Sequence, residues 1–325
     1  MDPNWATLDT VGGTSVLRFE RHLAHPPQRV WSLVSDPAEL AHWFPAAVTY
    51  ATEPRPGVGV RFRFEGQDTD TTGEILEYEP PKLFSLRWQD DVLRFELVPD
   101  GDGCRLLFTH VISDSMGGAL AAGRNAAGWD TCLEALAAYL DGRDLKPLEE
   151  MFQRIAAYLE RYGLDRGDVA ETGEGFLVRF QRDLVWRPLE QVWGMLAGSQ
   201  RPTLGGPPPH GFTNRHVVPG EVTEIDPPRI LEYAWRHQGV PVGRVRWEFT
   251  VDPKLGHRVV LTQTLPAAHA RLRADVLAAW HARLEQCFAQ LGGATGSAEP
   301  NRSAEPNESA ERTDRFRAMY QARLP

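Results

Sequence analysis

The chain has 325 residues, of which 42% are hydrophobic and 24% charged, a composition typical of a globular protein with more than one domain. Its formal net charge of −9 argues against a general nucleic-acid-binding surface, which needs a basic face. Three widely spaced cysteines form neither a disulfide framework nor a zinc-binding pattern, and no stretch reads as a signal peptide or a membrane span, so we expect a cytoplasmic protein.

The first third of the chain predicts strands interrupted by two short helices. We expect a strand over residues 16–23, because its apolar residues alternate. Two short helices follow, and the second is predicted to be capped by Asp36 and to carry Trp43 and Phe44. Alternating apolar and polar residues over 58–64 predict a half-buried strand.

Two hairpins and a long helix are predicted next. Segment 73–88 places a Pro-Pro turn between two short runs, and this pattern favours a β-hairpin with one buried face. A second hairpin is predicted over 93–110, where an Asp-Gly turn separates two alternating runs. A long amphipathic helix follows over about 126–140, and Gly142 is placed to end it.

Most of these patterns return in the second half of the chain. The Gly-Glu, Pro-Pro and Trp residues of segment 73–88 recur in segment 220–235, each 147 residues later (220 − 73 and 235 − 88). The first strand, the last hairpin and the long helix also have matches in the second half, and all the matches occur in the same order as in the first half. The distance along the chain between matched residues varies by a few residues from one element to the next. Such a series indicates a duplicated domain with insertions and deletions in its loops. In the second copy, a Pro/Gly loop over 201–210 replaces the capped helix.

We therefore expect two domains, at residues 14–143 and 173–293, with an amphipathic connector helix within 144–172. The remaining segment, 294–325, repeats the residues Ser-Ala-Glu-Pro-Asn. Such a polar, Pro-containing stretch cannot bury a core. It is expected to form a disordered linker followed by a short terminal helix.

In their order, the motifs of the first copy resemble the SRPBCC (START-like) superfamily, and within it the subfamily similar to the C-terminal domain of the activator of heat-shock-protein ATPase. The resemblance covers about 14–142 and, with more departures, about 174–293. It implies an α+β helix-grip fold in each copy, in which a curved antiparallel sheet wraps around the long C-terminal helix and leaves a cavity for a hydrophobic small molecule. The residues that carry it are Arg21, Pro26, Val30, Trp31, Asp36, Pro37, Trp43, Gly73, Glu74, Pro80, Pro81, Trp88, Gly103, Thr109, His110, Trp129 and Leu133.

The expected ligand contacts come from the apolar strand faces, the segment after the capped helix and the long helix. His110 shares a face with Phe108, so it either holds the polar end of a ligand or is a hydrogen-bonded core residue. Arg21 either anchors an anion or forms an ion pair between sheet and helix. The aromatic residues are either cavity lining or plain core. The candidate ligand-binding residues are Trp43, Phe44, Phe62, Phe64, Trp88, Phe95, Phe108, His110, Trp129, Leu133 and Arg21.

The sequence contains no catalytic motif, metal-ligand spacing or phosphate-binding loop, so no catalytic residue, metal or cofactor is expected. The leading hypothesis is that the first copy binds a hydrophobic small molecule or lipid without catalysis. The resemblance leaves two alternatives open: a polyketide aromatase/cyclase-like enzyme, and a chaperone-ATPase-activator-like module with a protein partner. Neither a nucleic-acid partner nor a membrane span is expected.

Overall fold

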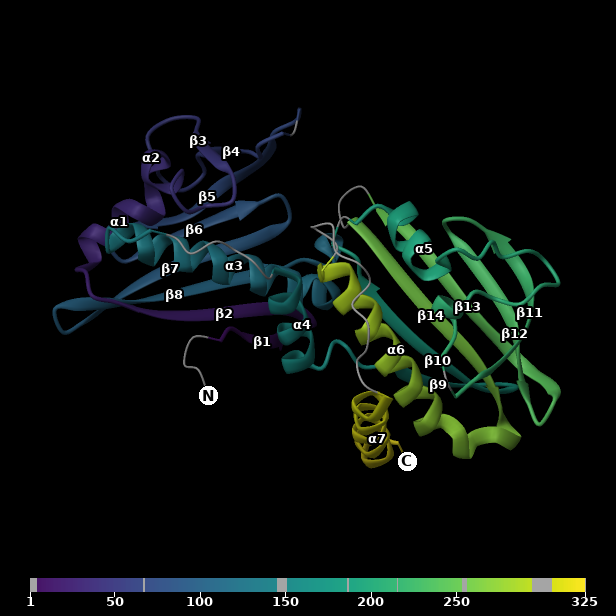
Figure 1. The fold of residues 1–325 in the computed structure, drawn as a ribbon. Coiled ribbons are helices and arrows are strands. Elements are labelled where there is room, and N and C mark those ends of the chain that lie inside the picture. Colours follow the sequence, from purple (N-terminus) through teal and green to yellow (C-terminus); the bar gives the residue numbers. More distant parts are fainter. Residues whose placement is uncertain are drawn as a thin grey trace. The chain divides into compact units, whose positions relative to one another are not determined.

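The computed structural model describes residues 5–66, 68–144, 151–185, 187–214, 216–252, 256–293 and 306–324. The chain divides into two compact units, Met1–Tyr158 and Leu159–Pro325. In each unit one antiparallel sheet packs against one long helix (Figure 1). This is the α+β helix-grip arrangement that the sequence predicts.

Unit 1 forms an eight-stranded sheet in the order β1-β2-β8-β7-β6-β5-β4-β3, and all neighbouring strands are antiparallel. Its helices are α1 (Pro27–Ser35), α2 (Pro37–Leu40), the long α3 (Gly118–Leu140), which follows the 3-10 turn η1 (Asp114–Met116), and α4 (Met151–Tyr162). Its strands are β1 (Thr7–Val11), β2 (Thr14–Leu23), β3 (Ala47–Tyr50), β4 (Gly59–Arg63), β5 (Thr71–Glu79), β6 (Leu83–Trp88), β7 (Asp91–Asp100) and β8 (Gly103–Ile112).

Burial in unit 1 follows the period of each element. Every second residue from Asp91 to Leu97 in β7 and from Cys104 to Ile112 in β8 is buried, as expected for strands with one covered face. Phe95 and Phe108 are direct partners across these strands, and their rings stack with centroids 4.6 Å apart. The predicted cap of α2 is present, because the carboxylate of Asp36 accepts a hydrogen bond from the backbone at the helix start.

Two segments outside the expected domain 14–143 also belong to unit 1. Strand β1 pairs with β2, so the sheet begins before residue 14. Helix α4, expected as a connector, packs on α3: the buried Tyr158 donates its hydroxyl hydrogen to Asp130, and Arg154 forms an ion pair with Glu134 at 2.8 Å. Most of α4 is therefore the last element of unit 1. Residues 145–150 of the expected connector lie outside the described residues.

Unit 2 repeats this plan with fewer elements. Its sheet order, β11-β12-β13-β14-β10-β9, corresponds to β5-β6-β7-β8-β2-β1 of unit 1, and its described residues contain no counterpart of α2, β3 or β4. Its helices are α5 (Leu189–Ala197), α6 (Arg273–Gly293) and α7 (Pro306–Arg323), with 3-10 turns η2 (His210–Phe212) and η3 (Ala267–Leu272). Its strands are β9 (Asp168–Thr172), β10 (Gly175–Asp183), β11 (Val218–Asp226), β12 (Ile230–His237), β13 (Val240–Asp252) and β14 (Gly256–Pro266).

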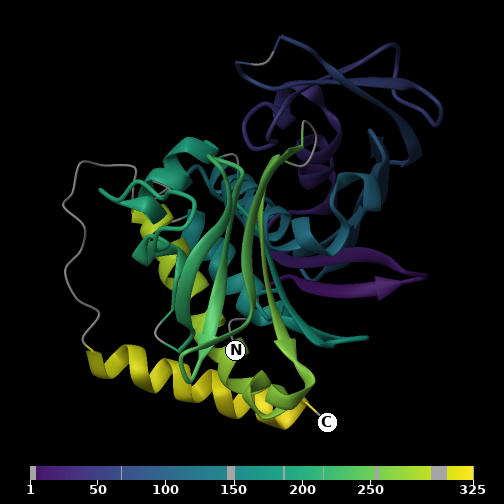
Figure 2. The same cartoon turned by 90° about the vertical axis from the view of Figure 1, so that its right-hand side faces the viewer.

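The terminal helix α7, the yellow helix at the bottom of Figure 2, packs on α6. Two of its side chains belong to the core of unit 2. Phe316 and Tyr320 are buried, and the Phe316 ring stacks on His281 with centroids 3.8 Å apart. The short terminal helix expected from the sequence is thus 18 residues long and docked on the body of the unit. Of the disordered linker expected over 294–311, residues 294–305 lie outside the described residues, whereas 306–311 belong to α7.

Candidate functional site

Eight aromatic side chains of unit 1 form a continuous cluster on the helix-covered side of the sheet, and all eight are predicted ligand-binding residues. Contacting rings have centroids 4.6–6.2 Å apart, the usual range for packed aromatic pairs. Because adjacent rings touch, they fill much of the space in which the resemblance implies a cavity. We call this set the aromatic cluster: Trp43, Phe44, Phe62, Phe64, Trp88, Phe95, Phe108 and Trp129.

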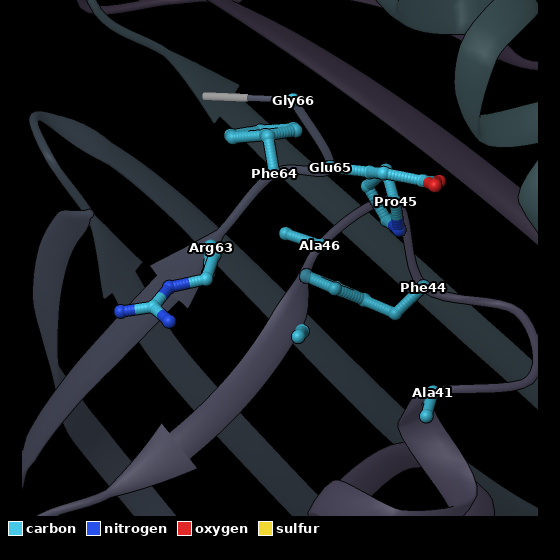
Figure 3. Close-up of a pocket in the computed structure, with 9 residues that line it drawn as sticks. Ala41, Phe44, Pro45, Ala46, Arg63, Phe64, Glu65 and Gly66 are labelled. Atoms are coloured by element: carbon cyan, nitrogen blue, oxygen red, sulfur yellow. The ribbon is translucent and has the colours of Figure 1, made fainter. Parts of the chain in front are cut away.

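A pocket of about 400 Å³ lies at the edge of the aromatic cluster, where the segment after α2 meets the end of β4 (Figure 3). Its volume is in the range of small-molecule sites, about 300–1,000 Å³. Phe44 and Phe64 are the predicted residues in its wall, and Trp88 stacks behind Phe64 at 5.4 Å. The lining residues are Ala41, Phe44, Pro45, Ala46, Ala47, Arg63, Phe64, Glu65 and Gly66.

The lining of the pocket combines apolar side chains with two charged ones, Arg63 and Glu65. The side chains of Arg63 and Glu65 extend in opposite directions (Figure 3). The Arg63 guanidinium binds the carboxylate of Asp70 through two hydrogen bonds, of 2.8 and 3.1 Å. These bonds favour the ionised carboxylate and lower the pKa of Asp70. Asp70 therefore largely compensates the charge of Arg63 beside the pocket.

His110 lies in a buried hydrogen-bond network with Trp129 and Asp91. Trp129 Nε1 donates to His110 Nδ1 at 3.0 Å, so the proton of a neutral imidazole resides on Nε2, which faces Asp91 Oδ2 at 2.8 Å. The other oxygen of Asp91 accepts from the backbone N–H of Ser113 at 2.8 Å. Both ring nitrogens thus have protein partners, which is the core-histidine interpretation of this position.

Arg21 lies in an ion pair rather than in the pocket wall. Its guanidinium binds one oxygen of Asp130 on α3, and Tyr158 of α4 donates to the other oxygen. The Tyr158 oxygen in turn accepts from the backbone N–H of Ala6 at 3.2 Å. This Arg–Asp–Tyr group ties β2, α3, α4 and the start of the chain together. It matches the ion-pair interpretation of Arg21. Leu133, one turn further along α3, is fully buried in the core.

The equivalent position in unit 2 uses different chemistry. Gln263 has the register of His110, because it pairs with Val245 of β13 as His110 pairs with Leu93 of β7. The Gln263 amide oxygen accepts from Trp280 Nε1 at 2.6 Å. Gly243 stands at the register of Asp91, and a Cβ there would lie 2.6 Å from the indole nitrogen of Trp235. Only glycine fits beside that indole.

The turn that ends the Pro/Gly loop of unit 2 supplies a core aromatic residue where unit 1 has α2, β3 and β4. Phe212, in turn η2, is fully buried, with its ring 4.9 Å from that of Trp193 and 5.6 Å from that of Trp247. Its carbonyl oxygen accepts from Tyr233 and from Trp247, both at 3.0 Å. Turn η2, at the end of the loop, thus places a ring deep in the core of unit 2.

Sequence reasoning missed most of the pocket wall. Ala41, Pro45, Arg63 and Glu65 come from the end of α2, the turn after it and the end of β4, and no motif links these segments. One available signal is Pro45, because a proline directly after Trp43-Phe44 ends the helical segment there and favours a turn. Asp91, the partner of His110, has no local sequence signal.

A family model described as "Activator of Hsp90 ATPase homolog 1-like protein" matches residues 24–141. No curated protein matches the chain. Within the described residues, no helix combines the length and the apolarity that crossing a bilayer requires.

Several solved structures are similar to about half of the chain. A conserved protein of unknown function from Enterococcus faecalis, EF2215, is 21% identical over 49% of this chain and 90% of its own, with a TM-score of 0.43. CalU16 from Micromonospora echinospora is 22% identical over 49% of this chain and 94% of its own, with a TM-score of 0.38. A protein from Bordetella parapertussis is 24% identical over 50% of this chain and 94% of its own, with a TM-score of 0.35.

The family match spans most of unit 1, from the end of β2 to the end of α3, and includes the capped α2, both hairpins and the long helix. Unit 2 keeps the same order of strands around its own long helix. Unit 1 therefore contains a domain like those of the Activator of Hsp90 ATPase homolog 1-like family, with an SRPBCC-like fold.

Proposed function

We propose that unit 1 binds a largely apolar small molecule in the pocket beside Phe44 and Phe64. The observation that carries this proposal is a pocket of about 400 Å³ that is lined by apolar and charged side chains and backed by the aromatic cluster. The SRPBCC fold, a ligand-binding fold, supports the same conclusion. Burying most of a drug-sized ligand there corresponds to micromolar affinity, about −8 kcal/mol.

The ring of Phe64 offers a route from the pocket into the aromatic cluster. Phe64 lies just beyond the last residue of β4, so the strand ladder does not hold it, and its side chain is only half-buried. Its ring covers one side of the Trp88 indole. Rotation of Phe64 away from Trp88 would let an apolar ligand stack on the indole face. The Arg63–Asp70 pair at the rim would then face the polar end of the ligand.

The test is a titration of the full chain with the anionic naphthalene dye ANS. Ala47 is exposed on the edge strand β3 and lines the pocket, so Ala47→Trp fills the pocket without changing the core. Thr49→Trp, two residues along the same strand and outside the pocket lining, is the matched control. We expect Ala47→Trp to weaken dye binding at least about tenfold, or 1.4 kcal/mol, and Thr49→Trp to leave it unchanged. Equal binding by both variants would exclude this pocket.

A second candidate function is contact with a chaperone ATPase, favoured by the description of the matched family. Adding the full chain to purified Hsp90 and measuring ATP hydrolysis tests it. Stimulation that survives Ala47→Trp would assign this activity to a surface outside the pocket. The cyclase-like alternative needs a proton-transferring group, and Glu65 is the lining residue that has one.

A further inference from the structure

Three potential metal ligands meet in the core of unit 2. His281 and Glu285 lie one turn apart on α6, and Asp165 lies in the segment before β9. His281 Nε2 is 3.0 Å from Asp165 Oδ2 and 3.7 Å from Glu285 Oε1, and one ligand atom from each residue lies within 4.8 Å of the others. We propose that these side chains bind a divalent transition-metal ion, with Zn²⁺ as the expected occupant.

The ligand set and spacing suit zinc. An imidazole nitrogen with carboxylate oxygens is a common zinc environment, and tetrahedral bonds of about 2.0–2.2 Å place ligand atoms about 3.4 Å apart. The observed separations of 3.0 and 3.7 Å bracket that value. An ion could therefore enter with only small side-chain shifts.

The carboxylate of Asp165 provides an independent indication of a ligand. Asp165 is 7% exposed, and its Oδ1 has no hydrogen-bond partner within the described part of the chain. A buried carboxylate oxygen without a partner is costly, and a cation held by both oxygens of Asp165 would satisfy it.

The duplicated arrangement in unit 1 shows how this cluster differs from an ordinary ion-pair network. The counterpart of His281, 151 residues earlier, is Asp130, which binds Arg21 and Tyr158. The counterpart of Glu285 is Glu134, held by Arg154 at 2.8 and 3.2 Å. Each carboxylate on α3 thus has its own arginine.

In unit 2 the arginines are placed differently. Phe316 of α7 takes the position of Arg154, and it stacks on His281 instead of neutralising Glu285. Arg182, the counterpart of Arg21, donates to the backbone carbonyl of Asp165, not to its carboxylate. Arg312 lies 3.7 Å from Glu285 Oε2, which leaves Oε1 directed at His281. Carboxylate oxygens of two acids are thus available beside one imidazole.

The surroundings of His281 orient its ring for such a role. Tyr320 places its hydroxyl 3.0 Å from His281 Nδ1, and the Tyr320 oxygen accepts from the backbone N–H of Gly167 at 2.9 Å. With Nε2 on a metal, Nδ1 carries the proton and donates to that oxygen, the usual outer partner of a metal-bound histidine. The ion would join α6, the approach to β9 and, through Tyr320, α7, so its role is to stabilise unit 2.

The experiment uses the untagged full chain, freed of metal with a chelator and titrated with Zn²⁺ by calorimetry and with Co²⁺ by visible absorption. Glu285→Gln removes one ligand, and Glu134→Gln is the matched control at the equivalent, arginine-paired position of unit 1. We expect one site per chain, an affinity at least about tenfold weaker in Glu285→Gln, and no change in Glu134→Gln. The thermal midpoint should rise with zinc concentration in the wild type and in the control.

Asp165→Asn provides the same test should Glu285→Gln not fold, as judged by circular dichroism. A chain that binds no stoichiometric zinc, or binds it equally well with and without Glu285 or Asp165, would overturn the proposal. The ten histidines of the chain do not confuse the result, because surface binding is the same in both glutamine variants.

Discussion

His110 and Gln263 occupy equivalent positions in the two sheets but form different hydrogen bonds. In both units the indole of the long helix donates to the strand residue, to an imidazole nitrogen in unit 1 and to an amide oxygen in unit 2. Unit 1 adds Asp91, whereas unit 2 has Gly243 and fills that space with Trp235. The shared requirement is an acceptor for a buried tryptophan N–H.

His110→Leu should therefore destabilise unit 1. It leaves Trp129 Nε1 and Asp91 Oδ2 without their partner, and each unpaired buried group costs about 1–3 kcal/mol. We expect the free energy of unfolding to fall by at least about 2 kcal/mol in urea titrations. His110→Gln keeps an acceptor for the indole, as Gln263 does, and should lose less. Equal losses for the two variants would contradict this account of the network.

The three cysteines should be unreactive in the folded protein. Burial raises the pKa of Cys132 to about 12 and also raises that of Cys104 and Cys287, because a thiolate is poorly solvated there. Since the thiolate is the nucleophile, the native chain should react very slowly with DTNB at pH 8. All three thiols should react in urea. A rapid phase of one thiol per native chain would show that a cysteine is accessible.

At the scale of elements, α4 and α7 are counterparts. Each follows the long helix of its unit and buries one tyrosine, Tyr158 or Tyr320. The oxygen of that tyrosine accepts a hydrogen bond from the backbone N–H of the residue just before the first strand of the unit. Those two N–H groups, of Ala6 and Gly167, are 161 residues apart, the same spacing as Arg21 and Arg182. The tyrosine helix is thus a duplicated element of the fold.

The sequence signal for this element is short. Ala-x-Tyr-x-x-Arg over 156–161 recurs over 318–323, but the remaining residues of the two helices differ. Phe316 of α7 stands where α4 has Arg154, because the two helices face different partners, His281 and Glu134. Three identical positions in a helix are too few to indicate a repeat without the contacts that explain them.

Removing residues 294–325 should destabilise unit 2. The deletion takes away the Phe316 ring that covers His281 and the Tyr320 hydroxyl that partners His281 Nδ1 and the Gly167 N–H. We expect the thermal midpoint of unit 2 to fall by several degrees, since 1 kcal/mol corresponds to about 2–4 °C in a domain of this size. Tyr320→Phe, which removes only the hydroxyl, should produce part of that fall. An unchanged midpoint in the truncated chain would show that α7 adds nothing to stability.

At the scale of the whole molecule, the sequence predicts the fold in much more detail than it predicts the pocket. Hairpins at 73–88 and 220–235 correspond to β5–β6 and β11–β12, because alternation and Pro-Pro turns are local properties. The pocket depends on how closely Phe44, Phe62 and Trp88 pack and on where the end of α2 meets β4. Those are outcomes of packing among distant segments, and no pattern in the sequence specifies them.

A division of the chain after Gly163 should yield two fragments that each fold. Gly163 ends α4 with a φ of +67°, and the Tyr158–Asp130 and Tyr320–His281 contacts remain within their own fragments. Fragments 1–163 and 164–325 should each unfold cooperatively in urea, followed by circular dichroism.

The shorter fragment 1–143 is the control, because it ends at the domain boundary expected from the sequence. It lacks Tyr158 and Arg154, so Asp130 loses a hydrogen bond, Glu134 loses its ion pair, and the apolar face under α4 is exposed. Its unfolding midpoint should therefore lie clearly below that of 1–163. If the two fragments unfold at the same urea concentration, α4 is a connector after all, and the repeated unit ends with the long helix.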